Sequence, residues 1–106
     1  MKCHLQLMDS VFSVLESLPE NLAFDIFRKL DYLSEFPKMG SPLGARFPQL
    51  EGFRQLLYKR RTRIIYDFDE HDGTVYVLFI QDCRQELPSA RDLKRDTARN
   101  DELPFE

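Results

Sequence analysis

The spacing of the hydrophobic positions changes from helical in the first third of the chain to alternating in the middle. Residues 2–8 alternate weakly, which predicts a short strand with Cys3, Leu5 and Leu7 on one side. Apolar residues then recur at intervals of three and four positions, as on one face of a helix. They form two stripes, Val11, Val14, Leu15 and Leu18, and then Leu22, Ile26, Leu30 and Leu33. The pattern therefore predicts a strand followed by two amphipathic helices.

Polar residues and prolines indicate where these helices begin and end. Asp9 or Ser10 can cap the first helix with a side-chain oxygen. The segment Ser17–Glu20 has the spacing of a capping box, so the second helix is expected from about Pro19 to Phe36. Two aromatic side chains are expected to widen its apolar stripe, Phe27 and Phe36. Proline and glycine then keep the chain in loops up to about residue 48.

Three consecutive antiparallel strands are predicted between residues 53 and 88. The first begins at Arg54, and the other two are Thr62–Phe68 and Thr74–Ile80, which are rich in β-branched and aromatic residues. Asp69–Gly73 forms the loop between the last two strands, where Gly73 can adopt a positive φ.

The remaining residues extend the predicted domain. Ser89 and Asp92 match a capping box, which allows a charged C-terminal helix over Ser89–Asn100, and residues 101–106 look like a frayed acidic tail. The order is then β-α-α-β-β-β with this closing helix. We expect a single α+β domain over residues 1–106, with two N-terminal helices packed on an antiparallel sheet.

Composition narrows the class of protein. The chain is 42% hydrophobic and 31% charged, as in an ordinary globular domain. No apolar run approaches the length of a membrane span, so no membrane partner is expected. Two cysteines, Cys3 and Cys83, cannot build a disulfide framework or a four-ligand zinc site. A reducing cytoplasm is therefore the expected location, and neither a metal nor a cofactor is predicted.

Charge is unevenly distributed along the chain. The net charge is −3, but residues 1–36 carry −3, residues 37–66 carry +6 and residues 67–106 carry −6. The positive side chains of the predicted strands and their turns are Arg54, Lys59, Arg60, Arg61, Arg63 and Arg84. Guanidinium groups near one sheet are suited to binding phosphate or an acidic protein segment. A solvent-exposed turn neutralised by Asp67, Asp69 and the acidic tail explains the same charges equally well.

A pattern over roughly residues 1–90 resembles the RelE/ParE superfamily of toxins from bacterial toxin–antitoxin systems. It reads P-x-L-x-G-F-R, then R-I-I-Y-D-F-D, then V-Y-V-L-F-I-x-x-x-R, after a two-helix hairpin. The residues that carry it are Pro48, Leu50, Gly52, Phe53, Arg54, Arg63–Tyr66, Val75–Ile80 and Arg84. The resemblance implies one fold with two activities, since RelE-type members cut messenger RNA at the ribosome and ParE-type members poison DNA gyrase. It also implies a cognate antitoxin that binds the toxin.

The RNase branch of this family implies a metal-independent endoribonuclease site. Arg54, Arg63 and Arg84 match its catalytic cations, while Lys59, Arg60 and Arg61 would bind RNA phosphate. This chain departs from the branch in two places: Leu56 replaces an often basic residue, and no tyrosine or histidine follows Tyr76. Because arginine is a poor proton carrier, other residues would have to move the proton. The candidates are Asp82, Glu86 and His71.

The activity therefore stays open between three alternatives. Arg63 and Arg84 are compatible with messenger RNA cleavage and with gyrase inhibition, whereas Leu56, the missing tyrosine and a pI of about 5.4 favour a non-enzymatic gyrase inhibitor. A degenerate toxin that only binds its antitoxin is the third. Extra aromatic residues on the two helices indicate an antitoxin-binding surface, and these are Phe12, Phe24 and Phe27. Cys83 is expected to be a structural cysteine rather than a nucleophile.

Overall fold

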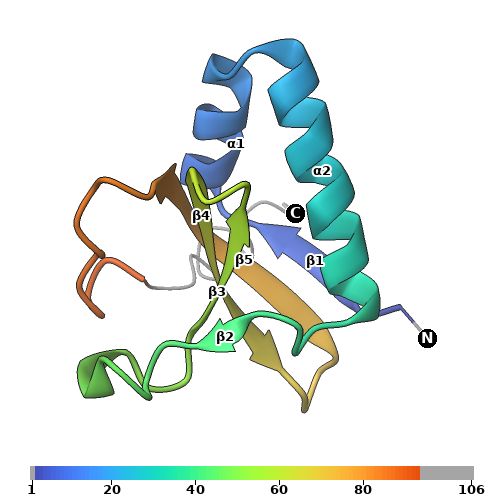
Figure 1. Ribbon diagram of the computed structural model, residues 1–106. Helices are drawn as coiled ribbons and strands as arrows, with labels where there is room; N and C mark the ends of the chain where they lie inside the picture. Colours follow the sequence, from blue (N-terminus) through green and yellow to red (C-terminus); the bar gives the residue numbers. More distant parts are fainter. Residues whose placement is uncertain (1, 94–106) are drawn as a thin grey trace.

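The computed structural model describes residues 2–93 (Figure 1). Within these residues the elements follow the predicted order, with one very short strand and a 3₁₀ turn added between the second helix and the three long strands. They are β1 (His4–Leu7), α1 (Asp9–Ser17), α2 (Glu20–Glu35), β2 (Ser41–Pro42), η1 (Pro48–Leu50), β3 (Arg54–Tyr58), β4 (Thr62–Asp69) and β5 (Thr74–Asp82).

The strands of residues 2–93 form one five-stranded sheet in the order β1-β5-β4-β3-β2. The pairs β2–β3, β3–β4 and β4–β5 are antiparallel, as expected for β3, β4 and β5, which are joined by short turns. β1 instead pairs in parallel with β5, with His4 opposite Thr74 and Leu7 opposite Val77. The predicted α+β fold is confirmed, and the parallel β1–β5 pairing makes the sheet mixed.

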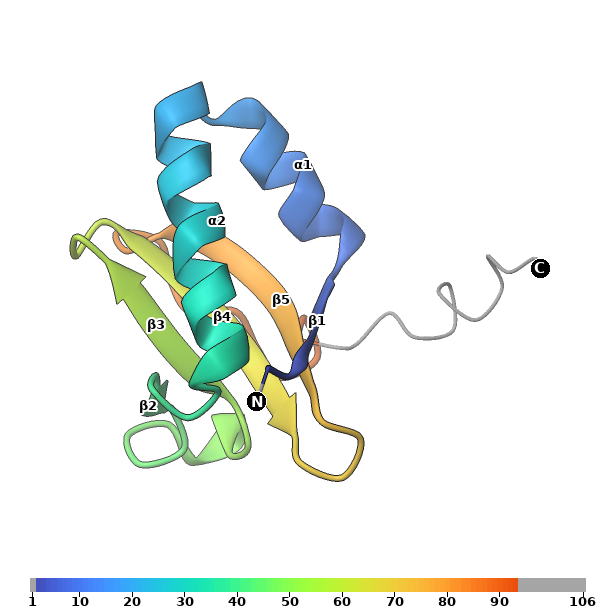
Figure 2. The ribbon, with the colours of Figure 1, turned by 90° about the vertical axis from the view of Figure 1, so that its right-hand side faces the viewer.

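Both helices lie on the same side of the sheet, over β5 and β1 (Figure 2). The core between them is formed by fully buried aliphatic side chains from both layers. The helices contribute Val11, Leu15, Ile26, Leu30 and Leu33, and the sheet contributes Ile64, Val75, Val77 and Ile80. Burial of such side chains stabilises each by about 1.5–3 kcal/mol, so this layer is the main source of stability.

The predicted helix caps are wrong. α1 begins at Asp9 after Met8, and no side chain caps it. Ser17 still belongs to α1, where its Oγ donates to Val14 O at 2.7 Å, so it cannot cap the next helix. α2 instead follows Pro19, whose fixed φ suits the start of a helix. The connection is too short to hold a separate capping box.

Phe27 and Phe36 do not widen the buried stripe of α2 as expected. Phe27 is 43% exposed and Phe36 is 58% exposed, because the sheet covers only the face that carries Ile26, Leu30 and Leu33. Both aromatic rings therefore face solvent and contribute to the surface of the protein.

The described part of the predicted C-terminal helix is a turn. Ser89 N and Oγ both donate to Asp92 Oδ2, at 3.2 and 3.1 Å, as the capping-box spacing predicts. Residues 94–100 of that predicted helix and the tail at 101–106 lie outside the described residues. Across residues 2–93, no helix is both long and apolar enough to cross a membrane.

A candidate phosphate-binding site

The structure does not bring Arg54, Arg63 and Arg84 together at one point. Arg54 lies opposite Tyr66 in the β3–β4 register, and Arg63 lies opposite Leu57. Because side chains alternate along a strand, Arg54 and Arg63 point to opposite faces of the sheet. Their roles in binding or catalysis therefore stay separate predictions, and each arginine has to be considered in its own surroundings.

Arg54 holds the loop that follows α2. Its Nη1 donates to Gly40 O at 2.7 Å and to Lys38 O at 3.2 Å. The same loop is held by Tyr66, whose hydroxyl donates to Pro37 O at 2.7 Å and accepts from Gly40 N at 2.9 Å. We call this group of bonds the Tyr66 latch. It gives Arg54 a structural task, in which Nη1 is engaged by two backbone carbonyls.

Arg63 is held across three adjacent strands by neutral groups. Its Nε donates to Gln55 Oε1 on β3 at 3.0 Å, and its Nη1 donates to Gln81 Oε1 on β5 at 2.7 Å. A longer bond of 3.4 Å joins Nη1 to Gln85 O. Gln81 is itself buried and donates through Nε2 to Glu86 O at 3.0 Å, which fixes the position of its oxygen. We call Gln55, Arg63 and Gln81 the glutamine clamp.

The glutamine clamp fixes the direction of a guanidinium group without neutralising its charge. A carboxylate partner would cancel that charge, whereas an amide oxygen orients the group and leaves it positive. Within residues 2–93, Nη2 of Arg63 makes no hydrogen bond, so a donor remains for an external acceptor. The arrangement suits the binding of an anion such as a phosphate oxygen.

Gln55 and Gln81 were not predicted from the sequence to be part of this site. Both are neutral, and neither stands next to Arg63 in the sequence. Their alignment with Arg63 depends on the register of three strands, which periodicity cannot predict.

Lys59 and Arg60 form the tip of the β3–β4 turn in a strained backbone conformation. Their φ angles are 52° and 57°, and Arg61 N donates to Tyr58 O at 3.1 Å. These features define a type I′ turn, which normally contains Asn-Gly because both central residues need a positive φ. Side chains other than Gly are uncommon there. The turn therefore presents Lys59, Arg60 and Arg61 to solvent at an energetic cost.

Arg84 lies beyond β5, close to this turn. Its side chain is 88% exposed, and its Nε and Nη2 each donate to Asp82 at 3.1 Å. The hydrogen bonds from Arg84, with a smaller contribution from the positive charge of Arg61, lower the pKa of Asp82 to about 2. A hollow of about 260 Å³ is lined by Arg60, Arg61, Asp82, Cys83 and Arg84.

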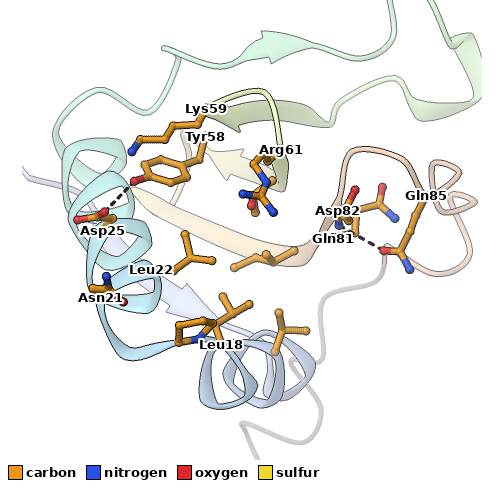
Figure 3. A pocket seen from close by; sticks show the side chains of 14 residues that line it. Leu18, Asn21, Leu22, Asp25, Tyr58, Lys59, Arg61, Gln81, Asp82 and Gln85 are labelled. Atoms are coloured by element: carbon orange, nitrogen blue, oxygen red, sulfur yellow. Dashed lines mark hydrogen bonds between the residues drawn. The ribbon is translucent and has the colours of Figure 1, made fainter.

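A larger groove of about 720 Å³ lies between the helix hairpin and the sheet (Figure 3), and it shares Arg61 and Asp82 with this hollow. Its apolar wall is formed by Val14, Leu18, Leu22 and Ile80, and Lys59 and Arg61 lie at its rim. Tyr58 closes one side, where its hydroxyl donates to Asp25 Oδ2 at 2.8 Å. Lys59 Nζ lies 5.5 Å from the centre of the Tyr58 ring, within the range of a cation–π contact.

Within the described part of the chain, none of the candidate proton carriers is hydrogen-bonded to Arg63 through its side chain. His71 lies in the β4–β5 turn, at the other end of β4 from the β3–β4 turn, and its N donates to Asp69 Oδ1 at 2.9 Å. Asp82 is paired with Arg84, and Glu86 is exposed. Across residues 2–93, no cluster of three or more potential metal-ligating side chains is present.

Phe12, Phe24 and Phe27 are all exposed, at 47%, 62% and 43%. They lie on α1 and α2 and do not line the groove between the helix hairpin and the sheet. Tyr32 of α2 and Phe36, which directly follows this helix, are also exposed, so the apolar surface extends along α2. Such an accumulation of aromatic side chains is a common feature of protein interfaces, and the predicted antitoxin contact there stays a prediction.

No protein-family model and no curated protein matches the chain. Solved structures do match. The RelBE2 toxin–antitoxin complex from Mycobacterium tuberculosis contains a chain with a TM-score of 0.66 and 21% identity, covering 77% of this chain and 99% of that one. The isolated E. coli RelE toxin has a TM-score of 0.61 and 12% identity, covering 97% of both chains.

A third structure is the archaeal RelE–RelB complex from Pyrococcus horikoshii. It matches with a TM-score of 0.55 and 17% identity, and it covers 81% of this chain and 100% of that one. Identities this low support a shared fold and leave the activity of this chain to be tested. The chain therefore has the fold of RelE toxins, as the sequence pattern predicted.

Proposed function

We propose that this chain is the toxin of a type II toxin–antitoxin pair, and that it cuts messenger RNA at the ribosome. The RelE fold supports the first part of the proposal, since two of the matching structures are complexes of a toxin with its antitoxin. The cognate antitoxin is then the expected protein partner, with the exposed aromatic side chains of α1 and α2 as the surface available to it.

The glutamine clamp is the observation that carries the second part. In RNA cleavage by a 2′-hydroxyl, negative charge builds on the oxygens of the attacked phosphate, and a fixed cation stabilises it. Arg63 is positive, is oriented by Gln55 and Gln81, and keeps Nη2 for an external acceptor. An arginine that is already held in place needs little reorganisation when the phosphate arrives. Arg63 is therefore the residue on which we expect cleavage to depend most.

A ParE-like gyrase inhibitor, or a toxin that only binds its antitoxin, is the alternative. Two observations favour it: Arg54 is engaged by backbone carbonyls, and Arg84 is paired with Asp82. The partners of Arg63 are amides and a carbonyl, none of which transfers a proton at neutral pH. Arg54 and Arg84 are therefore partly engaged by other groups, and no general base is among the hydrogen-bond partners of Arg63 within residues 2–93.

The test is methionine incorporation within minutes of inducing the chain alone in bacteria. The variants are Arg63→Ala, Arg63→Lys and a control, Arg28→Ala, which removes an exposed arginine from α2. We expect incorporation to collapse with the wild type and the control, and to persist with Arg63→Ala. Lysine keeps the charge but loses the two-pronged geometry that the clamp holds, so it should restore little activity.

Mapping of RNA ends in the same cells separates cleavage from other causes of arrest. New 5′ ends within translated messages support the nuclease. Undiminished incorporation with the wild type would contradict the proposal, and a supercoiling assay with purified gyrase would then separate the two alternatives. Inhibition of gyrase supports the ParE-like activity, and no inhibition supports a toxin that only binds its antitoxin.

A further inference from the structure

We propose that Arg60, Arg61 and Arg84 form a second phosphate-binding site, separate from Arg63, which takes one backbone phosphodiester of single-stranded RNA. This inference rests on the proposed function for the identity of the ligand. It reassigns Arg84, which the sequence pattern placed with Arg63, to the tip of the β3–β4 turn.

The backbone fixes this grouping. Thr62, the first residue of β4, lies opposite Asp82, the last residue of β5. Just beyond that pair, Cys83 N donates to Arg61 O at 2.7 Å. These contacts hold the residues after β5 against the turn, and they create the hollow of about 260 Å³ that the three arginines line. Arg84 therefore reaches the turn through connected backbone rather than through a flexible loop.

The charges of the hollow are not balanced. Three guanidinium groups surround one carboxylate, that of Asp82. Asp82 is engaged by Arg84, whereas the side chains of Arg60 and Arg61 make no hydrogen bond and no salt bridge within residues 2–93. The excess positive charge matches an anion, and arginine forks are well suited to phosphate oxygens. A phosphodiester, with one negative charge, would replace or share the contact of Asp82 with Arg84.

The hollow is distinct from the glutamine clamp. Thr62 and Arg63 are consecutive in β4, so their side chains point to opposite faces of the sheet. Asp82 faces the side of Thr62, since the two are directly paired. Arg63 is held on the other face by Gln55 and Gln81. One RNA strand that passes over the end of the sheet could contact both faces through different phosphates.

The strained turn gives independent support. Lys59 and Arg60 adopt positive φ at 52° and 57°, where a side chain costs roughly 1–2 kcal/mol per residue. Strain of this kind persists where function requires it and collects at binding sites. Asn-Gly would form the same turn more stably but would remove two positive charges. Lys59 and Arg60 therefore occupy turn positions at which Asn and Gly would give a more stable fold.

The test measures binding of a fluorescein-labelled uridine 12-mer by fluorescence anisotropy over a range of KCl concentrations. For single-stranded nucleic acid, log K falls with log salt, and the magnitude of this negative slope decreases by about 0.7 for each phosphate contact that is lost. We expect Arg61→Ala and Arg84→Ala each to decrease the magnitude of the slope by about 0.7. Because both bind the same phosphate, the double variant should lose little more than either single variant.

The double variant Arg84→Ala/Arg63→Ala is compared with the double variant Arg84→Ala/Arg61→Ala. Since Arg84 and Arg63 bind different phosphates, their effects on the slope should add. Asp82→Asn removes the internal competitor for Arg84, so it should tighten binding at low salt. The control Arg28→Ala should leave the slope unchanged, because this exposed arginine lies on α2, outside the hollow. Circular dichroism checks that every variant is folded.

Two results would overturn the inference: an unchanged slope in folded Arg84→Ala, or an Arg84→Ala effect that adds to Arg61→Ala but overlaps with Arg63→Ala. The assay contains no ribosome and requires no cleavage, so it fails independently of the proposed function. If translation collapses in an Arg63-dependent way but Arg84→Ala leaves the salt slope unchanged, the second phosphate site is refuted and the proposed function stands. If the salt slopes change as expected but translation is undiminished, the messenger RNA activity is refuted and the second phosphate site stands.

Discussion

Removal of one hydroxyl from the Tyr66 latch should cost the protein a large part of its stability. Tyr66→Phe keeps the buried ring and deletes the group that donates to Pro37 O at 2.7 Å and accepts from Gly40 N at 2.9 Å. Each bond contributes about 1 kcal/mol net, and a buried N–H left without a partner costs a further 1–3 kcal/mol. Phenylalanine has no hydroxyl to desolvate on folding, which offsets part of this loss of stability. We expect a loss of about 2–3 kcal/mol in the free energy of unfolding.

Urea denaturation followed by circular dichroism measures this loss. The midpoint should fall while the slope of the free energy against urea stays constant, because the surface exposed on unfolding is unchanged. In a thermal scan the same loss corresponds to a decrease of about 10–20 °C in Tm. The control is Tyr32→Phe, since Tyr32 is 52% exposed and its hydroxyl makes no hydrogen bond within residues 2–93. A Tyr66→Phe loss below about 0.5 kcal/mol would refute the reasoning, because a typical hydrogen bond contributes at least that much.

The pH dependence gives a second check on the same residue. Burial raises the pKa of Tyr66, although the Gly40 N–H and the charge of Arg54 act in the opposite direction. A folded-state pKa above the unfolded value of about 10 means that the contribution of the phenol is complete below pH 10. It is lost as the pH rises through the folded-state pKa. The stability difference between wild type and Tyr66→Phe should therefore narrow above pH 10.

Three further changes have expected outcomes. Gly40→Ala should destabilise the fold by about 2 kcal/mol in urea denaturation, because an added Cβ would lie 2.6 Å from a backbone oxygen and 2.7 Å from the Tyr66 hydroxyl, and overpacking of this kind costs 1–3 kcal/mol. The double variant Lys59→Asn/Arg60→Gly should raise stability by about 1 kcal/mol and weaken RNA binding; an unchanged melting temperature would argue against strain in the turn. In an NMR titration the pKa of Asp82 should be about 2. Its contribution to stability is therefore complete above pH 3.8, the unfolded value, and is lost as the pH falls through 2. Arg84→Ala should return the pKa of Asp82 toward 3.8, and an unchanged pKa in this variant would contradict the pairing.

The sequence was sufficient to predict the long elements of the fold. The predicted strands Thr62–Phe68 and Thr74–Ile80 match β4 and β5 to within two residues at each end, because β-branched and aromatic residues fill them densely. The apolar stripe of α2 matches its buried face for the same kind of reason. These patterns repeat over many residues, so single exceptions do not disturb them.

Short features were missed because they depend on tertiary contacts. β2 has two residues and contains Pro42, which would argue against a strand in the centre of a sheet. At the edge of the sheet the missing N–H of Pro42 is harmless. Nor did composition separate buried from exposed aromatic residues on α2, since Phe27 and Ile26 are neighbours in sequence and face opposite environments.

The candidate site was predictable in its charges and not in its geometry. The basic residues could be read directly, but the face on which each lies depends on register. Leu56 shows why: the family pattern often has a cation two positions after Arg54, yet in this structure that position shares the face of Arg54 and packs against the core. A cation at Leu56 would therefore not join Arg63. The neutral glutamines that orient Arg63 carried no signal of their own.

The parallel pairing of β1 with β5 links the two ends of the fold and so affects when folding can finish. His4 N donates to Gly73 O at 2.9 Å, and Met8 N donates to Val77 O at 3.2 Å, so the first strand finds its partner only in the last. A nascent chain that has already made both helices still lacks the strand on which they pack. Contacts between distant parts of a sequence also slow folding. During synthesis the face of α1 that packs on β5 therefore stays uncovered until β5 emerges, so the finished domain, with any activity that needs it, forms late.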